Sequence, residues 1–124
     1  MTVEQNLAFG LSHLPRTEAR ERIAALVRRA GLTGLEKRYP HQLSGGEARR
    51  AAIVRTLAPR PAILLMDEPL TNLNTELKSD LLQLIKEYAA ENKATLIYVT
   101  HDAGEAATIS NRVLLFKDGR LEEN

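Results

Sequence analysis

The 124-residue chain contains 44% hydrophobic and 27% charged residues and carries a formal net charge of +1 at pH 7. This composition is typical of one globular domain with a modest core and excludes a disordered chain. Its apolar runs are too short for membrane insertion, and its charge offers no long-range attraction to nucleic acid. The absence of cysteine excludes disulfide and thiolate chemistry.

The N-terminal third predicts two helices and a loop. Thr2 and Gln5 fit a capping box that opens a short helix ending near Gly10. A second helix begins after Pro15, and its apolar residues recur at helical spacing. These residues are Ile23, Leu26, Val27 and Ala30. Residues 31–43, interrupted by glycine and proline, are predicted to form a loop.

The following segment alternates between helices and strands. Ser44 opens a third helix that runs to about Leu57, and residues 62–66 are typical of a strand buried on both faces. A long helix starts near Asn74. A second buried strand (95–99), a short helix (102–109), a third strand (113–116), a hairpin turn (118–119) and a last strand (120–122) complete the prediction. Asp102 and Glu105 fit a capping box at the start of the short helix, which needs no functional explanation. This order indicates an α/β fold with a parallel sheet, divided into a helical part (1–60) and a sheet part (61–124).

Residues 43–47 read Leu-Ser-Gly-Gly-Glu. Ser44 and Glu47 can be explained as a capping box alone. The paired glycines, Gly45 and Gly46, additionally allow backbone N–H groups at a helix start to approach a ligand closely. Because free N–H groups at a helix N-terminus attract anions, all four residues form a candidate anion-binding site.

Three side chains follow the two predicted parallel strands. Asp67 and Glu68 come directly after the first strand, and His101 follows the second. The carboxyl ends of such strands share one sheet edge, so we expect these groups to lie close together. Asp67 is a candidate Mg²⁺ ligand and Glu68 a candidate general base for water. The alternatives are that Asp67 and Glu68 end the strand by chance and that His101 has a structural role. The other two histidines, His13 and His41, are expected to be structural or exposed.

Residues 43–47, the run Ile63 to Pro69 and the triplet Thr100 to Asp102 together resemble the signature motif, Walker B motif and histidine switch of ABC-type ATPases, in that family's order. The flanking residues 39–42 and Arg50 match what ATP-binding subunits of importers carry. The resemblance implies a helical signature subdomain followed by the C-terminal half of a RecA-like P-loop NTPase sheet.

The resemblance also implies cofactors and partners. ATP and Mg²⁺ would be the cofactors, and residues 44–47 would close on the γ-phosphate of ATP held by a second ATP-binding subunit. His101, at the same sheet edge as Asp67 and Glu68, would contact the γ-phosphate of the ATP bound there and steady the attacking water. The helices before Ser44 would contact membrane-spanning permease subunits, and the protein would lie in the cytoplasm, peripherally on the inner face of the cell membrane.

Two departures from the family pattern qualify this expectation. No stretch reads G-x-x-x-x-G-K-[ST], and Met1 to Gly10 resembles the segment just after the Q-loop. We therefore expect an importer-type C-terminal fragment lacking the Walker A and Q-loop region, with weak ATP binding and exposed strand edges that favour association. Asn74 stands where the family usually has aspartate, so it can cap a helix but supplies no charge.

Three functions remain open from the sequence. The leading hypothesis is a subunit that couples ATP hydrolysis to solute transport, inactive as this chain alone. The second is a soluble ABC ATPase that acts outside transport. The third is a non-catalytic interaction fragment that supplies only the signature side of a nucleotide site.

Overall fold

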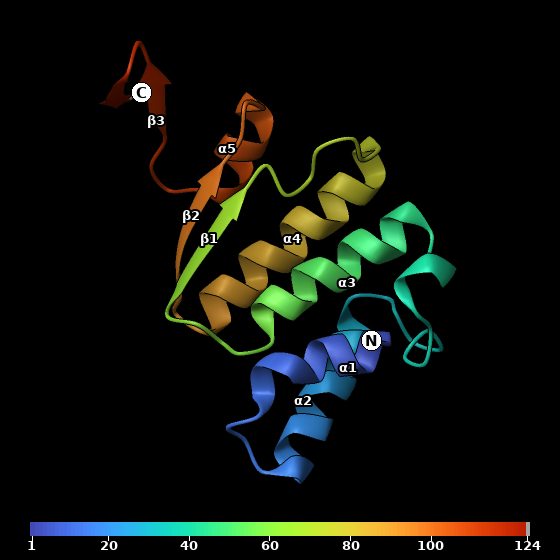
Figure 1. Cartoon of the computed structure of the whole chain (residues 1–124). Helices are drawn as coiled ribbons and strands as arrows, with labels where there is room; N and C mark the ends of the chain where they lie inside the picture. The colour runs from blue at the N-terminus through green and yellow to red at the C-terminus, as the bar shows by residue number, and fades with distance from the viewer. Residues whose placement is uncertain (124) are drawn as a thin grey trace.

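The computed structural model describes residues 1–123 and arranges the chain as helices stacked against a small parallel sheet (Figure 1). The N-terminal elements are α1 (Val3–Ala8), the 3₁₀ helix η1 (Phe9–Leu11), α2 (Arg16–Arg29), the 3₁₀ helix η2 (Pro40–Gln42) and α3 (Gly45–Leu57). The later elements are β1 (Ile63–Asp67), α4 (Thr75–Glu91), β2 (Thr95–Val99), α5 (Ala103–Ile109), β3 (Leu114–Lys117) and β4 (Arg120–Glu123).

Side-chain caps fix where the helices start. In α1, the Gln5 amide donates to Thr2 Oγ1 at 3.3 Å while the Thr2 amide donates to Gln5 Oε1 at 2.8 Å. The same reciprocal pair, at 3.2 and 2.9 Å, joins Ser44 and Glu47 at the start of α3. Asn74 Oδ1 accepts from the first turn of α4 at 2.9 Å. The predicted starts of these three helices are therefore confirmed.

Strands β1 and β2 pair in parallel, as predicted, with Leu64 opposite Leu96. Helices α3 and α4 pack on one face of this pair, with α1 and α2 beyond them (Figure 1). Leu64 and Met66 point from β1 into a core that also contains Val54 of α3 and Ile85 of α4. The core is continuous across residues 60 and 61, so the division of the chain at that point stays a prediction.

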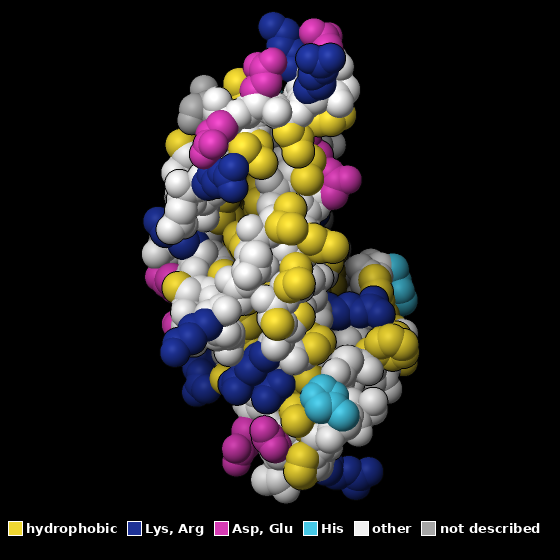
Figure 2. All heavy atoms as spheres, turned by 90° about the vertical axis from the view of Figure 1, so that its left-hand side faces the viewer, with side chains coloured by type: hydrophobic (Ala, Val, Ile, Leu, Met, Phe, Trp, Pro, Cys, Tyr) yellow, Lys and Arg dark blue, Asp and Glu magenta, His cyan; other side chains and the backbone are white. Residues whose placement is uncertain are grey.

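The opposite face of the sheet is open, which corrects the prediction that both strands are buried on both faces. Ile63 and Leu65 of β1 are 59% and 69% exposed, and Ile97 and Val99 of β2 are 52% and 53% exposed. Within residues 1–123 the helices lie on one side of the pair only, and Figure 2 shows hydrophobic side chains gathered on the uncovered side. Apolar sequence indicates which side chains favour burial, but not whether a covering layer is present.

The last two strands form a separate hairpin. β3 pairs antiparallel with β4, and in the described part of the chain it does not extend the parallel sheet. Asp118 and Gly119 connect the strands with φ values of 51° and 75°, the left-handed conformation that two-residue hairpin turns require. The hairpin turn and both strands are confirmed, and the hairpin projects away from the helices (Figure 1).

Candidate functional site

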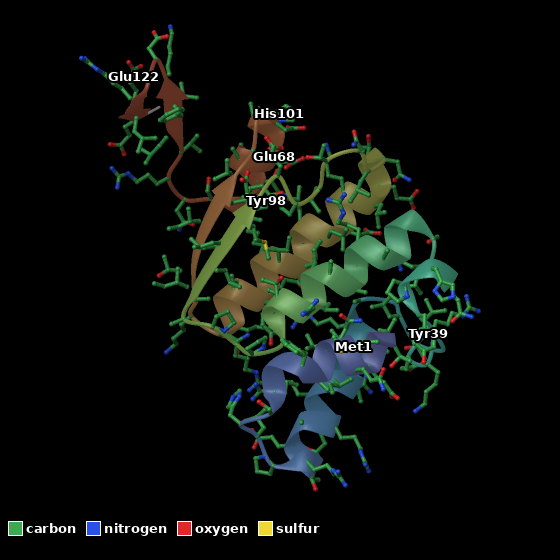
Figure 3. All side chains as sticks on the ribbon, viewed as in Figure 1. Met1, Tyr39, Glu68, Tyr98, His101 and Glu122 are labelled. Atoms are coloured by element: carbon green, nitrogen blue, oxygen red, sulfur yellow. The ribbon has the colours of Figure 1, made fainter. Side chains whose placement is uncertain are left out.

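Glu68 and His101 meet at the carboxyl edge of the parallel sheet. Glu68 follows β1 and His101 lies one residue beyond Thr100, which follows β2. The Oε1 atom of Glu68 is 2.7 Å from Nδ1 of His101 and accepts the His101 backbone amide at 3.1 Å. Figure 3 shows both side chains at this edge. The predicted juxtaposition is therefore present, and the 81% exposed His101 side chain is accessible to a ligand.

The backbone of Glu68 is strained. Its φ of 48° lies in the left-handed region, which costs a residue with a Cβ about 1–2 kcal/mol. Two interactions hold it there, because its amide donates to the Val99 carbonyl at 2.8 Å and Thr71 Oγ1 donates to its carbonyl at 3.1 Å. Thr71 also lies 3.3 Å from Glu68 Oε2. The strain turns the carboxylate over the end of β2, and such strain typically accumulates at functional sites.

The Glu68–His101 contact changes the protonation of both groups. The hydrogen bond from His101 lowers the pKa of Glu68, with the histidine charge and Thr71 adding to the effect. The same hydrogen bond, followed by the negative charge of Glu68, raises the pKa of His101. Glu68 is therefore held as a carboxylate, the form that accepts a proton.

Asp67 points differently from Glu68. As the last residue of β1 it is exposed, on the same open face as Ile63 and Leu65. Among residues 1–123 no cluster of three or more acidic or histidine side chains could hold a metal ion. Mg²⁺ usually keeps several waters and takes only one or two protein carboxylates together with phosphate oxygens. An exposed Asp67 carboxylate fits that mode of binding, and its assignment as a ligand stays a prediction.

The glycine pair at the start of α3 has two different structural explanations. A Cβ on Gly46 would lie 2.8 Å from Cδ2 of Leu77, so a larger residue would require the end of that half-buried side chain in α4 to shift. A Cβ on Gly45 would meet nothing within 4 Å, and Gly45 is exposed. Contact with Leu77 therefore favours glycine at position 46, whereas nothing in residues 1–123 requires a glycine at position 45. The open N-terminus of a 13-residue helix remains suited to an anion.

Arg49 is a site residue that sequence analysis missed. From the second turn of α3, its guanidinium donates to the carbonyl of Pro69 and, at 3.4 Å, to that of Thr71. It therefore joins the helix that begins at Ser44 to the loop that carries Glu68. No pattern in the sequence predicts this pairing, because its acceptors are backbone carbonyls 20 and 22 residues away.

A buried ionic cluster lies beneath the His101 turn and corrects a second prediction. Asp102 was expected to form a reciprocal capping box with Glu105, and Asp102 does accept the Glu105 amide at 3.0 Å. The Glu105 side chain, however, pairs with Lys78 at 3.0 Å. Burial and the adjacent Glu105 raise the pKa of the Tyr98 hydroxyl, which donates to Glu105 at 2.9 Å. Burial of a carboxylate is costly unless it is paired, and Lys78 together with the Tyr98 and Thr100 hydroxyls supplies the partners of Glu105 here.

The other histidines are exposed, as expected: His13 precedes α2, and His41 stacks on Tyr39 with 5.9 Å between ring centroids. None of the helices formed by residues 1–123 combines the length and apolarity needed to cross a bilayer.

Comparison with known proteins identifies similar sequences. A family described as "ABC transporter" matches residues 1–71. The chain is 40% identical over 129 residues to a sulfate/thiosulfate import ATP-binding protein of Agrobacterium fabrum, covering 99% of the chain and 37% of that protein. It is 42% identical over 125 residues to a spermidine/putrescine import ATP-binding protein of Acidothermus cellulolyticus, covering 99% and 33%. A thiamine import ATP-binding protein of Ruegeria sp. is 42% identical over 123 residues, covering 98% and 53%. The chain thus spans about a third to a half of these relatives.

Proposed function

This chain belongs to the ABC transporter family, and from that premise we propose that it supplies the signature, Walker B and histidine-switch parts of an importer's ATP-binding subunit. The observation that carries the proposal is the 2.7 Å contact between Glu68 and His101 at the carboxyl edge of β1 and β2. A carboxylate held in position by a neighbouring group can orient an attacking water and accept its proton during phosphoryl transfer.

Each residue at this edge then has a distinct task. Glu68, kept ionised by His101, accepts the proton of an attacking water. His101 orients the Glu68 carboxylate through Nδ1, and its exposed ring is available to a γ-phosphate. Asp67 would hold Mg²⁺, and the bound ion would supply positive charge to the phosphate oxygens.

The start of α3 serves a second nucleotide site. Ser44 and Glu47 satisfy each other's backbone amides, which leaves the amides of Gly45 and Gly46 at the first turn to receive a phosphate. The open space around Gly45 supports the approach of a ligand held by another chain. We therefore propose a dimer of ATP-binding subunits in which this helix closes on the partner's ATP, with Asn74 capping α4 but supplying no charge there.

The membrane-spanning partners would dock on the helical half. A groove between α1, η1 and α3 is lined mainly by small and apolar side chains, including Phe9, Leu43, Ala48, Ala52 and Pro59. Phe9 is exposed and lies under the Arg55 guanidinium at 5.2 Å from the ring centroid. A helix of a permease subunit fits this mode of recognition, which would hold the protein at the inner face of the membrane. The named relatives are all import proteins, which supports transport over a soluble role.

A chimaera tests this proposal. The 124 residues replace the matched segment of the thiamine import ATP-binding protein, whose remainder supplies the rest of the subunit. We expect Mg²⁺-dependent ATP hydrolysis, and Glu68→Gln should lower its rate by at least about 100-fold while ATP binding persists. Glu21→Gln, a matched change on the exposed surface of α2, should leave the rate unchanged. A folded chimaera that binds ATP but hydrolyses it equally fast with Glu68→Gln would refute the assignment.

A further inference from the structure

Glu105 is a charged residue in an unusual position. It lies in α5 and is only 5% exposed, although glutamate is almost never buried without a partner. Three groups meet its carboxylate: Lys78 Nζ lies 3.0 Å from Oε1, while the hydroxyls of Tyr98 and Thr100 donate to Oε2 at 2.9 and 3.0 Å. The carboxylate is therefore fully partnered by residues from α4, β2 and the turn that follows β2.

The same contacts enclose the turn that carries His101. Thr100 precedes His101, and its hydroxyl accepts the Asp102 amide at 3.0 Å while donating to Glu105. Asp102 follows His101 and accepts the Glu105 amide at 3.0 Å. Lys78 adds a 3.4 Å contact to the Asp102 carboxylate. The backbone on both sides of His101 is thus tied to one buried group.

Fold stability alone gives little reason for this cluster. Only the Glu105 side of the pair is buried, since the Lys78 side chain is 27% exposed, and the desolvation of a buried charge offsets much of the attraction to its partner. What such a cluster supplies is a fixed direction for each hydrogen bond. In this molecule the cluster fixes the orientation of His101. The backbone amide and Nδ1 of His101 lie 3.1 and 2.7 Å from the same atom, Oε1 of Glu68.

We propose that Glu105, charge-paired with Lys78, is a positioning residue that holds the His101 turn so that the imidazole meets Glu68. The placement of His101 stands on the contacts above. Its consequence for ATP hydrolysis rests on the function proposed in the preceding section, because only then does the Glu68–His101 pair act on water.

A double-mutant cycle on the 124-residue chain tests the placement without nucleotide. His101 is titrated by NMR in the unmodified chain, Glu68→Gln, Glu105→Gln and the double variant. Glu68, Asp102 and Glu105 are the charged groups that influence His101, and the cycle cancels the direct field of Glu105. We expect Glu68→Gln to lower the pKa of His101 in the unmodified chain, and most of this lowering to disappear in the Glu105→Gln background. In Glu105→Gln, hydrogen exchange of the His101 and Asp102 backbone amides should be at least about tenfold faster than in the unmodified chain.

If Glu105→Gln fails to fold, Lys78→Met replaces it in the same measurements, because it removes the charge that pairs with Glu105. Lys78→Arg keeps that charge and should show the exchange rates of the unmodified chain. Lys86→Met, an exposed change on the same helix, is the matched control and should alter nothing at His101. An unchanged effect of Glu68→Gln together with unchanged exchange, in a folded variant, would overturn the proposal. Loss of coupling combined with a chimaera that hydrolyses no ATP would instead contradict the proposed function and leave the positioning role intact.

Discussion

Gly45 and Gly46 lie side by side at the start of α3, and substituting each by alanine separates an effect on packing from an effect on ligand binding. Alanine is favoured over glycine in a helix by up to about 1 kcal/mol. Gly45→Ala should gain part of this, because its new Cβ meets nothing within 4 Å. Gly46→Ala places a Cβ 2.8 Å from Leu77 Cδ2, well inside the usual 3.5–4.0 Å carbon contact. The end of the half-buried Leu77 side chain must move, which places the cost at the low end of the roughly 1–3 kcal/mol typical of overpacking.

Urea denaturation followed by circular dichroism measures the difference. At a slope of about 2 kcal/mol per molar urea, a gap of about 1 kcal/mol separates the two midpoints by about 0.5 M, with Gly46→Ala the less stable. In the chimaera, Gly45→Ala should nevertheless lower ATP hydrolysis by roughly 100-fold, since a small displacement of a phosphate from its donors is costly. Equal stabilities would show that Leu77 does not press on Gly46, and full activity of Gly45→Ala would refute the role of the open helix start.

Three further predictions follow from the site and the sheet. The 124-residue chain should associate reversibly through its open sheet face, and Leu65→Lys should weaken this in sedimentation velocity; a monodisperse monomer that melts cooperatively would contradict it. Titration calorimetry should show very weak binding of ATP to the same chain, because its sequence contains no Walker A motif to hold the phosphates. A dissociation constant in the low micromolar range would contradict this expectation. Contact with Glu68 raises the pKa of His101 in the folded chain. The Glu68–His101 contact therefore stabilises the fold fully at pH values below the pKa of histidine in the unfolded chain, and this stabilisation is lost as pH rises through the pKa of His101 in the folded chain. The stability difference between the chain and Glu68→Gln should therefore shrink above that point, and a difference that grows with pH would reverse the assigned coupling.

Local sequence predicted the elements well, because their signals are local. The capping pairs at Thr2 and Ser44 and the turn at Asp118 each involve residues within three positions of one another. The pairing of Glu68 with His101 was also predictable, since parallel strands of similar length bring their carboxyl ends to one edge.

Structural features that depend on residues far apart in the chain could not be predicted from local sequence. Burial of β1 on both faces was wrong because Leu65 favours burial but has no layer to meet within residues 1–123. Glu105 was assigned to a helix cap, although Lys78, 27 positions earlier, is the stronger partner once both are packed together. The left-handed backbone of Glu68 could not be inferred either, because its restraint comes from the Val99 carbonyl.

The bridge formed by Arg49 has a mechanical consequence. Its guanidinium holds two carbonyls of the segment that immediately follows Glu68, while its own backbone belongs to the second turn of α3. A shift of that helix must either drag the Pro69–Thr71 peptide groups with it or break both hydrogen bonds. A displacement of the start of α3 would therefore be passed through one side chain to the loop that positions the Glu68 carboxylate.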